Sequence, residues 1–278
     1  MTRVAAVDLG THTTRLLVAD VESDRVDALV RRSVITRLGE DVDAQRRLAP
    51  EAVERVTDVL GAYRAEADRL GAERALAAAT SAVRDAANGC EFLRGLEERF
   101  GFRTRLLSGD EEAELIRRGA GIADDETLLL DVGGGSTELS LGRARTSLDV
   151  GSVRLTERHL ASDPPTRAEL AAAGAEVHAL LPELCPSGAV GVAGTVWQLR
   201  ELAGELTPAS VEAELERLAA LPLAERRRIP RLDPERAPVI VAGALIVLEV
   251  LRRYRLPSLA FSERDLLDGI ALAAAGED

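Results

Sequence analysis

The stretch that most constrains this chain runs from Asp131 to Glu138 and reads Asp-Val-Gly-Gly-Gly-Ser-Thr-Glu. Apolar residues lead into it, and alternating residues 139–141 follow it, a pattern that predicts a strand, a tight glycine turn and a second strand. Glycines allow a ligand to approach the backbone, and consecutive N–H groups in such a turn form an anion-binding concavity. The flanking carboxylates are typical ligands of a hard cation such as Mg²⁺, which accompanies phosphate.

The same pattern occurs near the N-terminus. Residues 8–18 align without a gap with residues 131–141, so that Asp8 matches Asp131 and Arg15 stands opposite Glu138. A single glycine turn is weak evidence because many hairpins contain one, and two unrelated hairpins are the alternative. Two matching Asp-x-Gly hairpins far apart in the chain favour a duplicated domain with two phosphate-binding hairpins facing one cleft.

Composition narrows the class of protein. A chain of 278 residues with 46% hydrophobic and 3% aromatic residues predicts one large or two ordinary globular domains with aliphatic cores. Without a long apolar stretch or a signal peptide, we expect a cytoplasmic protein with no membrane partner. Cys90 and Cys185 lack metal-ligand spacing and are expected to be buried, reduced thiols. A monomer and a homodimer both stay open.

The net charge of −12 argues against nucleic acid as a partner, because nonspecific nucleic-acid binding needs a basic surface. It also repels an anionic substrate at long range. Phosphate binding must therefore come from backbone N–H groups and a few side chains. The chain contains no lysine, so these side chains are arginines, which make rigid bidentate contacts with phosphate.

Two segments of the first half carry further candidate residues. A predicted strand at 73–79 ends on two hydroxyls and is followed by Arg84, which would hold a phosphate or pair with Asp85 or Glu91 on the surface. Ser108 is a plausible N-cap, with Glu111 completing a capping box. Successive helical residues point about 100° apart, so Glu111 and Glu112 cannot both face inward, and the apolar flank favours Glu112.

The second half repeats the order of elements after a polar joint predicted at 119–126. A short strand at 189–193 runs into Gly194-Thr195 and a helix, which is either a phosphate cradle or a plain strand–helix turn. One basic cluster is either a solvated face or a track for a long polyanion. It consists of Arg226, Arg227, Arg228, Arg231 and Arg236.

Together these segments resemble the exopolyphosphatase/guanosine pentaphosphate phosphohydrolase (Ppx/GppA) family over nearly the whole chain. The resemblance rests on residues 7–10, 80–88, 108–113, 131–138 and 194–195. It implies an α/β fold of two actin-like (ASKHA, ribonuclease H-like) domains with a cleft between them. Residues 1–119 plus 264–278 would form the domain with the first hairpin, and residues 120–263 the domain with the glycine-rich loop.

The resemblance also implies hydrolysis of a terminal phosphoanhydride, with Glu112 as catalytic base. Asp131 and Glu138 match the carboxylates that organise metal and water, Asp8 is a third candidate metal ligand, and the expected cofactor is Mg²⁺ or Mn²⁺. The candidate phosphate-binding residues are Gly10, Thr11, Thr13, Thr14, Arg84, Gly133, Gly134, Gly135, Ser136, Thr137, Gly194 and Thr195.

Two positions depart from the family pattern. His12 stands where an asparagine is usual, and Leu267 stands where an arginine is usual, which removes one phosphate contact. Long members carry an additional C-terminal helical domain that this sequence lacks. We therefore expect an exopolyphosphatase acting on inorganic polyphosphate, with a preference for short chains. The alternatives are a guanosine pentaphosphate (pppGpp) 5′-phosphohydrolase, an actin-like kinase and a non-hydrolysing polyphosphate or alarmone sensor.

Overall fold

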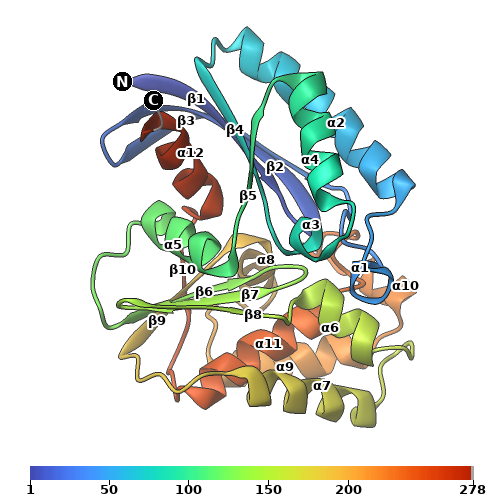
Figure 1. Ribbon diagram of the computed structural model, residues 1–278. Coiled ribbons are helices and arrows are strands. Elements are labelled where there is room, and N and C mark those ends of the chain that lie inside the picture. The colour runs from blue at the N-terminus through green and yellow to red at the C-terminus, as the bar shows by residue number, and fades with distance from the viewer. Residues whose placement is uncertain (277–278) are drawn as a thin grey trace. The chain divides into compact units, whose positions relative to one another are not determined.

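The computed structural model describes residues 1–276, which form two compact units (Figure 1). Unit 1 comprises Met1–Gly121 together with residues 264–276, and unit 2 comprises Ile122–Glu263. The chain thus leaves unit 1, builds the whole of unit 2, and returns to unit 1 with its last helix.

Unit 1 is built on a five-stranded sheet in the order β3-β2-β1-β4-β5. Its strands are β1 (Thr2–Leu9), β2 (Thr13–Glu22), β3 (Arg25–Ile35), β4 (Arg74–Ala79) and β5 (Arg103–Leu106). The first three form an antiparallel meander, whereas β4 runs parallel to β1 and β5 parallel to β4. The run of buried apolar residues in β1 is typical of a central strand covered on both faces.

Helices cover both faces of this sheet. α2 (Pro50–Arg69) and α4 (Gly89–Phe100) lie on one face, where Leu60 and Phe92 share a core with Val7 of β1. α12 (Leu266–Gly276) packs on β1 and β2, and α5 (Gly109–Ala120) packs against α12 (Figure 1). Two short helices, α1 (Val42–Gln45) and α3 (Ser81–Asp85), complete the unit.

α5 and α12 cross at two glycines. A Cβ at Gly119 would lie 2.1 Å from the carbonyl oxygen of Asp265, and a Cβ at Gly269 would lie 2.0 Å from that of Leu115. Backbones this close exclude any side chain, so both positions need glycine. The joint predicted at 119–126 begins two residues too early, because α5 continues to Ala120 and is capped by Gly121, which has a φ of 70°.

Unit 2 repeats the same design, with a sheet in the order β10-β9-β6-β7-β8. Its strands are β6 (Thr127–Val132), β7 (Thr137–Leu141), β8 (Ala144–Leu148), β9 (Gly188–Val192) and β10 (Ala260–Phe261). β6, β7 and β8 form an antiparallel meander, and β9 and β10 add parallel strands. Two units with this ribonuclease H-like strand order make an actin-like fold. The fold class predicted from the sequence is therefore confirmed.

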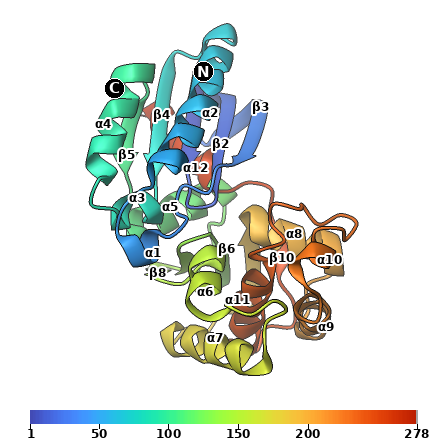
Figure 2. The ribbon, with the colours of Figure 1, turned by 90° about the vertical axis from the view of Figure 1, so that its right-hand side faces the viewer.

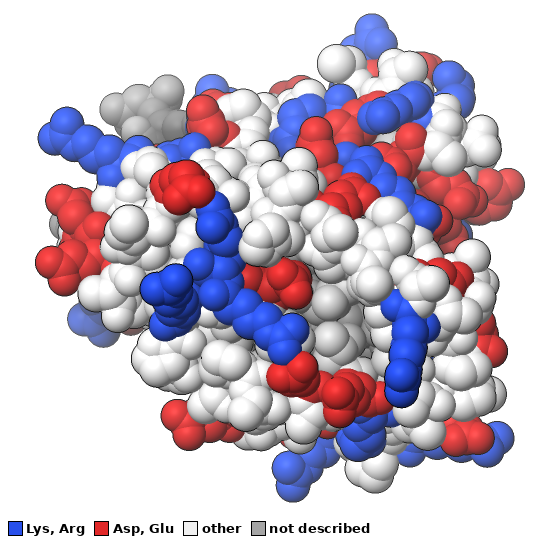
Figure 3. All heavy atoms as spheres, turned by 90° about the horizontal axis from the view of Figure 1, so that it is seen from below, with Lys and Arg blue, Asp and Glu red and all other residues white. Residues whose placement is uncertain are grey.

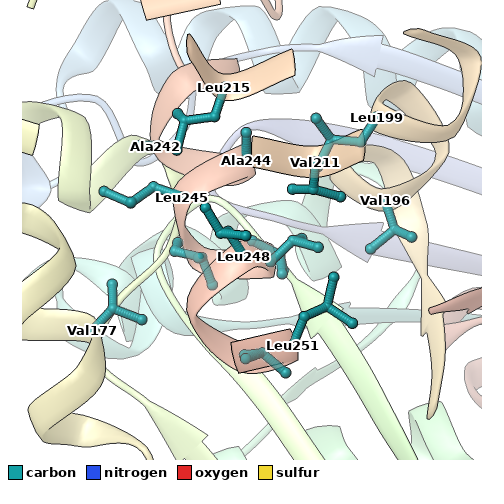
Figure 4. Close-up of a cluster of buried hydrophobic side chains, with 14 of the residues drawn as sticks. Val177, Val196, Leu199, Val211, Leu215, Ala242, Ala244, Leu245, Leu248 and Leu251 are labelled. Carbon is teal, nitrogen blue, oxygen red and sulfur yellow. The ribbon is translucent and has the colours of Figure 1, made fainter. Parts of the chain in front are cut away.

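The core of unit 2 gathers around one helix that is buried on almost all sides. The helices are α6 (Ser152–His159), α7 (Arg167–Leu180), α8 (Ala193–Ala203), α9 (Pro208–Ala219), α10 (Leu223–Arg226) and α11 (Ile240–Arg253). Leu245, Leu248 and Leu251 of α11 contribute to a cluster that includes Val177 of α7 and Val211 of α9 (Figure 4). α7 and α9 lie beside α11 in two views of the unit (Figures 1 and 2). The strongly apolar central helix predicted at 239–252 is confirmed.

Two further expectations concern the cysteines and membrane-spanning helices. Cys90 and Cys185 are exposed, so the prediction that both thiols are buried is wrong. Cys90 lies on the outer side of α4, and Cys185 lies between α7 and β9. Within residues 1–276, no helix combines the length and the apolar character needed to cross a membrane.

Candidate functional site

The hairpin of β1 and β2 places a buried carboxylate beside a turn. Asp8 is 4% exposed and faces Arg15 across the two strands. Its Oδ2 accepts hydrogen bonds from Nε of Arg15 at 2.9 Å and from Nη2 at 2.8 Å. Burial raises the pKa of Asp8, and the neighbouring guanidinium opposes that rise. Among residues 1–276, its buried Oδ1 has no hydrogen-bond partner, which suits a cation or a donor from a ligand.

The turn between β1 and β2 is held from outside by the segment after β3. The carbonyl of Thr11 accepts from the N–H of Gly39 at 2.8 Å, and the carbonyl of His12 accepts from the N–H of Thr36 at 3.1 Å. Across a trans peptide the next N–H points the opposite way. The N–H groups of His12 and Thr13 therefore point away from the carbonyls that this segment binds.

Two of the threonines predicted to bind phosphate use their hydroxyls inside the fold. Thr14 is fully buried and its Oγ1 lies 2.9 Å from the hydroxyl of Thr36, while Oγ1 of Thr11 lies 2.9 Å from the hydroxyl of Ser81. Thr14 thus belongs to the core of unit 1, which corrects the sequence-based interpretation. Thr13 is partly exposed, and Gly10 closes the turn through an N–H that donates to the carbonyl of Thr13 at 3.1 Å.

Arg84 and Glu112 meet behind the first hairpin. Arg84 lies on α3, where its Nη1 donates to the carbonyl of Leu107 at 2.7 Å and lies 3.5 Å from Oε2 of Glu112. Glu112 is 6% exposed in the first turn of α5. Within residues 1–276, the guanidinium of Arg84 lies beside Glu112. It does not pair with Asp85 or Glu91, the two surface partners that the sequence left open.

Glu111, next to Glu112, has a different environment. It accepts a hydrogen bond from the N–H of Ser108 at 2.9 Å while the hydroxyl of Ser108 caps the helix, so the predicted capping box is confirmed. These bonds, together with Arg105, lower the pKa of Glu111 to about 2. The carboxylate that remains buried beside Arg84 is that of Glu112, as the sequence predicted.

The hairpin of β6 and β7 places two carboxylates side by side. Asp131, one residue before the end of β6, lies directly opposite Glu138, and the two residues are 6% and 3% exposed. Oε1 of Glu138 accepts a hydrogen bond at 2.7 Å from the hydroxyl of Ser147 on β8. Sequence reasoning missed Ser147, although the alternation of β8 could have placed it opposite Glu138.

The glycine loop joins this carboxylate pair to α6. The N–H of Gly133 donates to the carbonyl of Ser136 at 3.0 Å and closes the turn, and a Cβ at Gly133 would lie 3.0 Å from that oxygen. The carbonyls of Gly133 and Gly134 accept from the first turn of α6. Within residues 1–276, the N–H groups of Gly134 and Gly135 donate to no protein acceptor, which leaves them available to an anion.

Two further hydroxyls of the predicted phosphate set are also used within the fold. Thr137 is fully buried and donates to the carbonyl of Val150 at 2.6 Å, and Thr195 donates to the carbonyl of Val132 at 2.7 Å. Their donor protons are therefore not directed at a ligand, and both threonines support the loop from behind. Ser136 is 2% exposed and is therefore buried as well.

Residues 17–277 match the Ppx/GppA phosphatase family. The chain belongs to this family. Exopolyphosphatase 2 of Mycobacterium tuberculosis is 38% identical to it over 99% of both chains. A solved exopolyphosphatase-like protein is 31% identical, with a TM-score of 0.91 over 98% of each chain. The Ppx/GppA enzyme of Aquifex aeolicus is 28% identical, with a TM-score of 0.81 over 98% of this chain and 99% of its own. The resemblance found in the sequence is confirmed, and the chain is an enzyme.

The donors of this Ppx/GppA phosphatase suit a hard divalent cation in chemistry, although no dense ligand cluster exists. Within residues 1–276, no group of three or more His, Cys, Asp or Glu side chains is arranged to hold a metal ion. Mg²⁺ typically uses one or two carboxylates plus water and substrate phosphate oxygens. The cross-strand pair Asp131 and Glu138 of unit 2 fits that demand.

Two candidate features of this phosphatase remain, the turn at Gly194 and the arginine cluster at residues 226–236. Gly194 lies in the first turn of α8, where a Cβ would lie 2.4 Å from the guanidinium of Arg236. Arg226 is 5% exposed and pairs with Asp163 at 3.2 Å, so it does not belong to a solvated face. Figure 3 shows arginine and acidic side chains interspersed over the face that it displays.

Proposed function

We propose that this Ppx/GppA phosphatase is an exopolyphosphatase that removes the terminal phosphate of inorganic polyphosphate. The observation that carries the proposal is Glu112, a buried carboxylate beside Arg84 at the start of α5. A carboxylate in this place can accept a proton from water while the guanidinium next to it contacts a phosphate oxygen. The name of the M. tuberculosis relative, exopolyphosphatase 2, supports the choice of substrate.

The proposed reaction is attack of a water oxygen on the terminal phosphorus, with cleavage of the bridging phosphorus–oxygen bond. Glu112 takes the proton of the attacking water, and the leaving polyphosphate carries away the bridging oxygen. Phosphoryl transfer depends chiefly on positioning and on stabilising charge, so the residues around Glu112 matter as much as the base. Arg84 supplies a cationic contact with a phosphate oxygen.

The two turns supply neutral donors in this proposal. In unit 1 the N–H groups of His12 and Thr13 point away from residues 36–39, and in unit 2 those of Gly134 and Gly135 point away from α6. Backbone N–H groups of this kind bind phosphate without a charged side chain. They suit a protein whose net charge of −12 does not itself attract an anion. A Mg²⁺ or Mn²⁺ ion held by Asp131 and Glu138, with Asp8 as a third candidate, would neutralise charge on the phosphate chain.

We further propose a preference for short chains. Distal phosphates of a long chain would need a basic track, and the sequence offers one cluster, residues 226–236. Burial of Arg226 against Asp163 removes one member of that cluster from the surface, and the buried guanidinium has a lowered pKa. Fewer distal cations weaken binding of long chains without changing the reaction at the terminal phosphate.

Phosphate release should be measured with Mg²⁺ on polyphosphates from a few to several hundred units and, in parallel, on pppGpp. Release from short polyphosphates that disappears in Glu112→Gln supports the proposal. A kcat/KM that rises steeply with chain length would contradict the short-chain preference. Release from pppGpp alone would identify the alternative phosphohydrolase, and tight binding without release would identify a sensor.

A further inference from the structure

The glycine loop of unit 2 is fastened to α6 by backbone hydrogen bonds that run in one direction. The N–H of Ser152 donates to the carbonyl of Gly133 at 2.9 Å. The N–H groups of Val153 and Arg154 both donate to the carbonyl of Gly134, at 2.8 Å and 3.1 Å. The first turn of a helix has no internal acceptors for these N–H groups, so α6 satisfies them with the loop.

This fastening fixes the direction of the loop's own donors. In a trans peptide the N–H points opposite to the carbonyl of the preceding residue. Because the carbonyls of Gly133 and Gly134 point at α6, the N–H groups of Gly134 and Gly135 point away from it. These are the two N–H groups that donate to no protein acceptor within residues 1–276. The helix therefore determines which side of the loop an anion can occupy.

Gly151 makes the close approach of loop and helix feasible. A Cβ at this position would lie 2.5 Å from the carbonyl oxygen of Gly134 and 2.7 Å from the nitrogen of Gly135. Its φ of −145° is accessible to any residue, so the need for glycine is one of space. The preceding residue is fixed as well, because the carbonyl of Val150 accepts the hydroxyl of Thr137 at the far end of the loop.

We infer that Gly151 and Ser152 are positioning residues that aim the glycine loop at a phosphate group. The inference rests on the proposed function and deepens it, since it identifies what holds the phosphate-binding turn in its productive direction. Neither residue needs to touch the substrate. Both act through the peptide groups of Gly133 and Gly134.

Two substitutions test this arrangement in different ways. Gly151→Ala pushes the loop away by steric overlap, with Gly188→Ala on β9 as control, because a Cβ there meets nothing within 4 Å. Ser152→Pro removes both donors to the carbonyl of Gly133, the N–H and the hydroxyl of Ser152. It keeps the helix, since proline is favoured at the first helical position and Gly151 has the extended backbone that precedes proline well. Arg167→Pro is the matched control at the exposed first residue of α7.

Binding of tripolyphosphate should be measured by calorimetry in the Glu112→Gln background, and the amide signals of Gly134 and Gly135 should be followed by NMR. We expect both test variants to weaken binding at least about tenfold in this background, as for lost charge-assisted donors. In the otherwise native protein, the same two substitutions should raise KM more than they lower kcat. We also expect the two amide shifts that tripolyphosphate causes to disappear, while both controls and the thermal midpoint of Ser152→Pro stay near the parent.

The inference is overturned, and the proposed function stands, if Ser152→Pro and Gly151→Ala leave binding in the Glu112→Gln background unchanged while the native protein hydrolyses tripolyphosphate. A parent that binds no tripolyphosphate would overturn both. Should Gly151→Ala fail to fold, the proline variant decides alone.

Discussion

Asp8 and Arg15 face each other across the hairpin of unit 1 at the positions where Asp131 and Glu138 face each other in unit 2. The duplicated hairpins thus differ in charge at one position. Arg15 compensates its partner and also donates to Asp265, just before α12, whereas unit 2 keeps two carboxylates together.

Loss of Arg15 should destabilise unit 1. Arg15→Ala leaves the carboxylates of Asp8 and Asp265 buried without their common cation, and removal of one partner from a buried pair costs about 3 kcal/mol or more. Chemical denaturation near neutral pH measures the loss. The control is Arg25→Ala, because Arg25 pairs with Asp27 in solvent and such pairs contribute less than about 1 kcal/mol. Equal effects of the two changes would refute the structural role of Arg15.

Glu112→Gln should lower turnover at least about a hundredfold, the lower end for a lost general base, while tripolyphosphate binding stays within a few-fold. Steady-state and binding measurements on one preparation separate the two effects. Glu111→Gln is the control, since glutamine also completes a capping box. Our assignment is wrong if Glu111→Gln is the damaging change and Glu112→Gln is benign.

Activity should require Mg²⁺ or Mn²⁺ and vanish in EDTA. Asp131→Asn and Glu138→Gln should weaken Mn²⁺ binding, read by electron paramagnetic resonance without substrate. Ser147→Ala should weaken it about tenfold, because Ser147 orients the carboxylate of Glu138. Thr146→Ala, whose side chain points to the other face of β8, is the control. Full activity in EDTA would remove the metal from the mechanism.

Stability should fall in acid partly through two helix caps. Hydrogen bonds from Ser108 lower the pKa of Glu111 from 4.5 to about 2, and those from Thr166 do the same for Glu169. The two carboxyl groups therefore bind protons more tightly in the unfolded chain than in the folded protein. Their contribution to the free energy of unfolding is complete above pH 4.5 and is lost as the pH falls toward 2. The double variant Glu111→Gln/Glu169→Gln should flatten urea midpoints between pH 6 and 3. Parallel curves for variant and parent would contradict this assignment.

Features that depend on neighbouring residues were predictable from the sequence. The capping box of α5, the two glycine hairpins and the inward direction of Glu112 each follow from a few adjacent residues and the geometry of one helix or turn. The duplicated strand order followed from the match between residues 8–18 and 131–141.

Features that depend on distant partners were not predictable. The hydroxyls of Thr14 and Thr195 suggested ligand contacts, but they bond to Thr36 and to the carbonyl of Val132, residues that only the fold brings near. Arg226 looked solvated until Asp163 was placed beside it. The exposure of Cys90 depends on which side of α4 faces the sheet, and α4 itself was not predicted.

The return of α12 to unit 1 sets an order of events during synthesis. A ribosome releases the chain from its N-terminus, so the whole of unit 2, residues 122–263, emerges before the helix that covers β1 and carries Gly269 against Leu115. The second unit is continuous and can be completed first. Until α12 arrives, one face of the β1 strand is bare and Arg15 lacks Asp265. The unit encoded first is thus the last to be finished.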